Sequence, residues 1–143
     1  MALALFNKAF RLGILTRSDE EMATYDEVVR RFGDAQEPAL QERAAKALYN
    51  KAITLSGMNR SDDEMAVYDE VVRRFGDAPG LAVREQVAKS LVNKGITLAG
   101  LNRTDAAVAV YDAVIRRFGD SSEPVLLEQV AKATTNKAAL ERP

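Results

Sequence analysis

The sequence contains neither cysteine nor histidine. Without cysteine there is no disulfide framework and no thiolate metal site. Without histidine the chain lacks the commonest general base and the commonest metal ligand. These absences argue against an enzyme, and no cofactor or metal is expected.

An excess of charge of one sign is also absent. The chain carries 20 basic and 21 acidic side chains, which nearly cancel. Binding to nucleic acid by counterion release usually needs a clear basic excess. We therefore expect no nucleic-acid partner.

Long hydrophobic runs are missing as well. The opening Met-Ala-Leu-Ala-Leu-Phe ends at Asn7 and Lys8, so it is too short for a signal peptide. No other stretch approaches the length of a membrane span. The sequence predicts a cytoplasmic protein with no membrane partner.

What the chain does contain is a repeat of 43 residues. Asn-Lys-Ala/Gly recurs four times and Arg-Arg-Phe-Gly-Asp three times, with constant spacing. Neighbouring copies are identical at roughly 25 of 43 positions, and a fixed period of this size indicates stacked supersecondary units. The predicted domain is a single array over 1–143, with units at about 4–46, 47–89 and 90–132 and a partial unit at 133–143.

Each unit contains two helical patterns and no strand pattern. In the second copy, apolar residues at helical spacing form a broad face: Met65, Val67, Tyr68, Val71, Val72 and Phe75. The connections are short, which favours antiparallel neighbours. We predict an all-α, right-handed solenoid of seven helices, at about 2–15, 19–32, 37–57, 62–75, 80–100, 105–118 and 124–141.

Signals for helix starts recur with the same period. Ser61 with Glu64 three residues later forms a capping-box pattern, and Ser18 with Glu21 repeats it. In the third copy Ala107 replaces the carboxylate. These patterns predict that the second helix of each unit begins at or just after the capping residue.

Signals for helix ends also recur. A glycine follows the last apolar residue of each second helix, where a left-handed residue closes a helix: Gly33, Gly76 and Gly119. Asn59 and Asn102 stand where a left-handed residue is needed between the two helices of a unit. Thr16 breaks that pattern, so the first turn is expected to differ.

These features resemble the tetratricopeptide repeat (TPR), a two-helix motif of 34 residues. The second copy matches its spacing at Leu48, Ala52, Leu55, Tyr68 and Val71, and the third at Leu91, Gly95, Leu98, Ala107, Tyr111 and Val114. The period here is longer, so the chain is most similar to a TPR-like class of about 42 residues per repeat. The first helix of that class starts earlier.

One position departs from the family pattern. A lysine recurs where the motif normally has a buried leucine: Lys8, Lys51, Lys94 and Lys137. A buried lysine needs a partner. The candidates are Asp26, Asp69 and Asp112, unless the ammonium group reaches water.

The repeated arginine pairs also suggest a role within the unit. Arg73 or Arg74 is expected to pair with Glu85 of the next helix or with Asp77 in the turn. Recurrence in every copy favours this structural role over contact with a ligand.

The resemblance implies that the first helices line a concave groove that holds a peptide. The positions it assigns to the groove are Asn7, Lys46, Tyr49, Asn50, Ile53, Lys89, Asn93, Ile96, Lys132 and Asn136. Amides pair with peptide backbone and lysines bind carboxylates, so a protein or peptide is the expected partner, with an acidic peptide as one candidate. The asparagines have an equally open interpretation, in which they bond across neighbouring helices and order the stack.

Two functions remain after these exclusions. The first is a non-enzymatic protein- or peptide-binding scaffold. The alternative is a self-assembling structural module that stacks end to end, because helix 124–141 is half a unit whose apolar face is expected to lack a partner in the chain. If Leu126 and Val130 face outward, charged residues placed there should shift such an assembly to the monomer. A segment of a longer array would show the same feature.

Overall fold

The computed structural model describes the backbone of residues 2–142 and the side chains of residues 17–142. Over that range the chain is helical and forms no strand, which confirms the all-α class. The helices are α1 (Ala2–Phe32), α2 (Pro38–Gly57), α3 (Ser61–Phe75), α4 (Leu81–Gly100), α5 (Thr104–Phe118) and α6 (Pro124–Leu140). The bounds of α4 and α5 are those of α2 and α3 advanced by 43 residues, so the sequence period is also a structural period.

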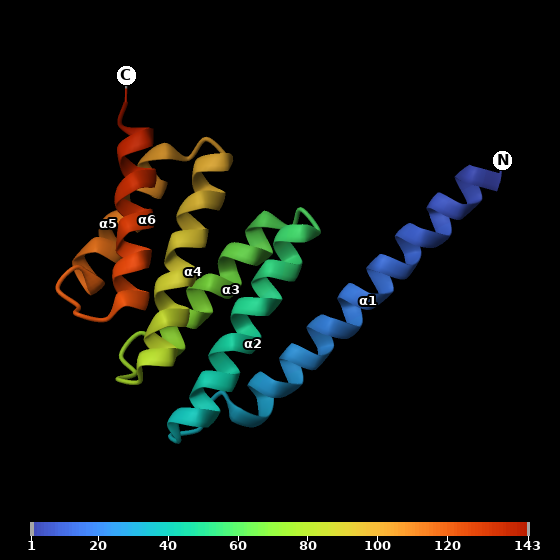
Figure 1. Ribbon diagram of the computed structural model, residues 1–143. Coiled ribbons are helices and arrows are strands. Elements are labelled where there is room, and N and C mark those ends of the chain that lie inside the picture. Colours follow the sequence, from blue (N-terminus) through green and yellow to red (C-terminus); the bar gives the residue numbers. More distant parts are fainter. Residues whose placement is uncertain (1, 143) are drawn as a thin grey trace.

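The helices from α2 onward stack in chain order (Figure 1). Helix α4 packs on both α2 and α6, so these three form one layer, and α3 and α5 pack against that layer. Helices α2 and α4 therefore each contact the second helix of their own unit and the next helix of their layer. This arrangement is that of a helical-repeat stack. Its right-handed sense remains a prediction.

The core repeats with the same period. Tyr68, Val71 and Phe75 of α3 are at most 2% exposed, and their counterparts on α5 are also buried. The aromatic ring packs against a small residue on the first helix of its own unit. At Gly95 a Cβ atom would lie 2.8 Å from Cζ of Tyr111. The small residue and the tyrosine of the TPR pattern are thus in contact within the unit.

The turns inside the units depend on asparagine. Asn59 and Asn102 have φ values of 58° and 60°, as predicted, and no other non-glycine residue in the described range has positive φ. The left-handed conformation is strained for β-branched side chains, whereas asparagine adopts it more readily. These two asparagines allow α2 and α4 to reverse direction into α3 and α5.

The prediction of seven helices is wrong at the first unit. Residues 2–15 and 19–32 form one continuous helix, α1, instead of two helices separated by a turn. Thr16 stands at the position of Asn59 and Asn102. Because threonine is β-branched, it disfavours the left-handed turn, and the helix continues through this position.

The capping boxes are also wrong. Helix α3 begins at Ser61, and its N-cap is Arg60, which makes no side-chain capping bond. Ser18 and Glu21 lie inside α1. The carboxylate of Glu64 is instead turned into the protein, where only 2% of the residue is exposed.

The glycines that follow the second helices are not left-handed. Gly76 has φ of −58° and Gly119 has φ of −62°, and no described glycine has positive φ. The lack of room for a side chain explains the glycine at position 76 better than a left-handed backbone conformation does. A Cβ atom there would lie 2.5 Å from the Val72 carbonyl oxygen and 3.2 Å from Nη1 of Arg117. Glycine therefore permits a close approach to the carbonyl oxygen of its own helix, and the contact with Arg117 of the next unit is the looser of the two.

The recurring lysines pair with aspartate, as predicted. The Nζ atoms of Lys51, Lys94 and Lys137 lie 2.7, 2.6 and 2.7 Å from Asp26, Asp69 and Asp112 respectively. Each pair joins the first helix of one unit to the second helix of the unit before it. The contact with Asp112 raises the pKa of Lys137. The side chain of Lys8 lies outside the described residues.

The predicted partners of the arginines are wrong. Arg74 contacts Glu70 on its own helix at 3.5 Å and Asp34, in the turn of the preceding unit, at 3.6 Å. Glu85 pairs with Lys89 instead. The arginine therefore links its unit to the preceding turn and not to the next helix.

Candidate peptide-binding face

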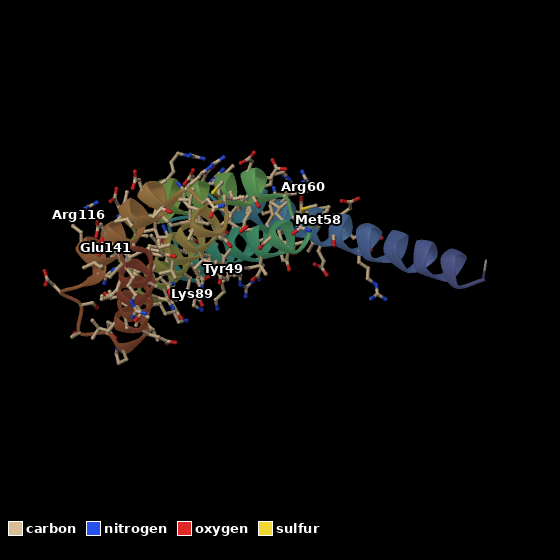
Figure 2. All side chains as sticks on the ribbon, turned by 90° about the horizontal axis from the view of Figure 1, so that it is seen from above. Tyr49, Met58, Arg60, Lys89, Arg116 and Glu141 are labelled. Carbon is tan, nitrogen blue, oxygen red and sulfur yellow. The ribbon has the colours of Figure 1, made fainter. Side chains whose placement is uncertain are left out.

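The predicted site residues with described side chains come from α2, α4 and α6, which form one layer. Figure 2 places Tyr49 and Lys89 on one side of the molecule, with Met58 and Arg60 on the other. Ile53 is 43% exposed and Ile96 is 50% exposed. Two large apolar side chains thus reach solvent at equivalent positions. Asn7 is carried by α1, and its side chain lies outside the described residues.

Each lysine of this face already has a carboxylate partner. Lys46, Lys89 and Lys132 lie 2.7, 3.2 and 3.6 Å from the glutamate one helical turn earlier in their own helices: Glu42, Glu85 and Glu128. Such exposed pairs contribute little to stability. They do neutralise most of the positive charge that an acidic ligand would meet. The face is therefore closer to neutral than the lysines alone suggest.

The asparagines at equivalent positions have different surroundings. Asn93 is partly buried, and its Nδ2 donates a hydrogen bond of 2.9 Å to the Tyr49 hydroxyl of the preceding unit. Burial and the nearby Glu64 carboxylate raise the pKa of Tyr68, while a hydrogen bond with Asn93 acts in the opposite direction. Asn50 is exposed. The structural interpretation therefore fits Asn93, whereas Asn50 is free to meet a ligand.

This difference gives a matched test of stability. Asn93→Ala is expected to lower the free energy of unfolding by about 1 kcal/mol, because the Tyr49 hydroxyl loses its donor at a partly buried site. Asn50→Ala is expected to change it by less than about 0.5 kcal/mol, as is usual for an exposed side chain. Urea denaturation followed by circular dichroism measures both. Equal effects of the two substitutions would contradict the assignment.

The most pronounced hollows of the described residues lie away from the predicted face. A hollow of about 380 Å³ lies where α1, α2 and α3 meet, and its lining includes Lys51 and Leu55. Another, of about 370 Å³, lies beside the turn between α1 and α2 and is lined by Arg73 and Arg74. Neither contains a predicted site residue. The face suits an extended segment better than a small molecule.

A partly buried polar contact, which was not predicted from the sequence, joins neighbouring units. Thr97 Oγ1 of α4 donates a hydrogen bond of 2.7 Å to Glu64 of α3. Thr54 and Glu21 repeat the contact one unit earlier, at 3.4 Å. One unit later, both positions are apolar together, as Ala107 and Leu140. This joint change between copies is the signal that could have revealed the pair.

Helix α6 is better covered than predicted. Leu126 is fully buried and Val130 is partly buried, because α6 packs on both α4 and α5. The condition that these residues face outward therefore fails for Leu126. The exposed residues of α6 are mixed in character: Leu127 is 39% exposed, whereas the exposed Thr134 stands where α4 has the buried Leu91. End-to-end stacking through α6 stays a prediction.

Repeating helix pairs stacked side by side define a helical-repeat protein. A family model described as Tetratricopeptide repeat matches residues 89–121, which include most of α4 and all of α5. The chain thus carries a TPR-like repeat, and the resemblance is confirmed. No curated protein and no solved structure matches the chain significantly.

Among the helices that the structure describes, none combines the length and the apolar character needed to span a bilayer.

Proposed function

We propose that this protein is a non-enzymatic scaffold that binds a peptide segment of another protein on the face formed by α2, α4 and α6. TPR-like repeats suggest a protein-interaction role. The observation that supports this face is the pair of exposed isoleucines, Ile53 and Ile96, which recur at equivalent positions. Tyr49 of α2 reaches Asn93 of α4 with its hydroxyl group and offers an aromatic surface.

The chemistry of the face suits an extended peptide. Ile53 and Ile96 offer apolar contacts at intervals set by the helix spacing, and Asn50 offers an amide that can both donate to and accept from a peptide backbone. The aromatic ring of Tyr49 has the Lys89 ammonium group 6.0 Å from its centroid, so it already has one cationic neighbour. Apolar and aromatic anchors of this kind usually supply most of the affinity of an interface.

A displayed peptide library, selected against the intact protein, provides the test. For a selected peptide, Ile96→Ala is expected to weaken binding about fivefold or more, because truncation of an anchor typically costs over 1 kcal/mol. Leu101→Ala is the matched control, since Leu101 is 41% exposed but lies in the turn after α4. It should leave the affinity unchanged.

Two results would reject the proposal. Equal losses from Ile96→Ala and Leu101→Ala would place the peptide elsewhere or show nonspecific adhesion. No selected peptide at all would reject the binding role of this face.

An acidic ligand remains part of the proposal and has its own test. If the lysines bind carboxylates, Lys89→Ala should weaken an acidic peptide more at low salt than at high salt, because exposed charges are screened. The glutamate beside each lysine competes with the ligand. A loss that does not depend on salt would assign the contact to the aliphatic stem of Lys89 instead.

A further inference from the structure

The continuous helix α1 leaves one surface of the stack uncovered. In the second and third units, the first helix covers Tyr68, Val71 and Phe75 or their counterparts, and all of these residues are at most 4% exposed. In the first unit the corresponding residues are only partly buried: Tyr25, Val28 and Phe32. A hollow of about 380 Å³ opens over Val28 and Phe32.

The same gap appears on α2. Leu40 is partly exposed and Arg43 is exposed, whereas their counterparts on α4, Val83 and Gln86, are 1% and 5% exposed. The difference arises because α4 is covered by the preceding helix of its layer, while α2 has no such neighbour. The uncovered surface therefore spans residues 19–32 of α1 and the start of α2, which is the place of a missing first helix.

The segment that would fill this place is in the chain but held away from it. Residues 4–15 repeat the sequence positions of 47–58 in α2, including Leu5, Ala9 and Leu12 at the sites of Leu48, Ala52 and Leu55. Because α1 does not turn at Thr16, its N-terminal half runs away from the other helices (Figure 1). It packs on none of α3 to α6. A straight helix cannot lie against its own second half.

We propose that a second copy of this chain supplies the missing helix, in a reciprocal exchange of residues 2–15 across a two-fold axis. The two helices of a unit run antiparallel, so the α1 helices of two chains would lie antiparallel with Thr16 near the axis. Each N-terminal half then covers the 19–32 surface of the other chain, and both surfaces are filled by one symmetric contact. The contact involves neither α6 nor the peptide-binding face.

Length and chemistry agree with this arrangement. Thirty-one residues of helix extend about 46 Å, enough for both halves to overlap a partner fully. In the third unit the small residue Gly95 sits against the Tyr111 ring. Ala9 would place an equally small residue against Tyr25 of the other chain.

Thr16→Asn tests whether the exchange depends on the continuity of α1 at Thr16. This position is called the hinge below. The wild-type chain is expected to sediment as a dimer of the 15.7 kDa chain at micromolar concentrations. Asparagine restores the turn residue of the other units, so the first helix can fold back on its own chain. The dimer dissociation constant should rise about tenfold or more, because a left-handed residue becomes accessible at both hinges.

Thr134→Asn is the matched control. Thr134 is an exposed helical threonine whose hydroxyl donates to the Val130 carbonyl, and it lies on α6, outside the proposed contact. This variant should remain a dimer. A wild-type chain that is monomeric at every concentration would overturn the proposal. So would a dimer that Thr16→Asn and Thr134→Asn weaken equally.

Cross-linking distinguishes exchange from other arrangements even if Thr16→Asn fails to fold. The sequence has no cysteine, so the double variant Ala9→Cys/Tyr25→Cys has only the two introduced thiols. With a short dithiol-reactive cross-linker, a dimer band on a denaturing gel supports exchange. A cross-link within one chain means that the helix folds back, and no cross-link means that it stays unpaired. Either of these two results would overturn the proposal.

Discussion

Gly95→Val is expected to lower the free energy of unfolding by about 3 kcal/mol, the largest effect of any single substitution proposed for this protein. A Cβ atom at Gly95 would lie 2.8 Å from Cζ and 2.9 Å from Cδ1 of Tyr111. The tyrosine is only 1% exposed, so its ring has no free space to move into. The two branches of valine add further overlap, and the helices α4 and α5 must separate.

Gly100→Val separates this steric effect from helix propensity. Gly100 lies at the end of the same helix, and a Cβ atom there would meet nothing within 4 Å. Valine is a better helix former than glycine, so this variant should be within about 0.5 kcal/mol of wild type. Chemical denaturation followed by circular dichroism measures both variants. If they have equal stability, the contact with Tyr111 does not require glycine.

Asn102→Thr should lower the free energy of unfolding by about 2 kcal/mol. Asn102 has φ of 60°, a conformation that costs L-residues roughly 1–2 kcal/mol and is worst for β-branched side chains. The variant places in the third unit the same residue, threonine, that the first unit has at the equivalent position, Thr16. The same denaturation experiment gives the size of the loss.

Asn102→Gly controls for the loss of the asparagine side chain. Glycine adopts positive φ without strain, so this variant should stay within about 1 kcal/mol of wild type. If Asn102→Thr is as stable as Asn102→Gly, then the β-branch at Thr16 does not explain why α1 continues. In that case the proposed hinge would also lose its physical basis.

The sequence alone determined the features that depend on periodicity. Apolar residues such as Val71 and Phe75 recur at helical spacing in every copy, and burial follows directly from that spacing. The Lys94–Asp69 pair was predictable because both residues recur with the repeat, and a lysine at an apolar position needs a partner. The asparagine turns were predictable from conformational preference.

Local patterns gave wrong answers where the same residues serve two purposes. Ser61 and Glu64 satisfy the capping-box spacing, yet Glu64 accepts a hydrogen bond from Thr97 of the next unit. Gly76 fits the pattern of a left-handed helix end, but it is right-handed, and a Cβ atom there would crowd the Val72 carbonyl oxygen of its own helix. For Glu64 the deciding neighbour comes from another unit, 33 residues away in sequence.

For the candidate site too, the sequence predicted one part and the structure decided another. The sequence identified which residues share the face, because that follows from helical spacing and the family resemblance. It left the role of the asparagines open, since Asn50 and Asn93 occupy equivalent positions. Only the packed structure distinguishes them, because Asn93 is partly buried and donates to the Tyr49 hydroxyl, whereas Asn50 is exposed.

For this protein, the sequence determined the helical class, the period, the repeating core and the turn residues, because each depends on spacing or on the conformational preference of one residue. The tertiary structure decided the partners of Glu64 and Arg74, the burial of Leu126 and the uncovered surface beside α1. These depend on which surfaces meet when units stack. Thr16 belongs to both groups. Its β-branch is visible in the sequence, but only the structure shows the consequence, which is that α1 continues past the turn position and leaves residues 19–32 without the first helix of their unit.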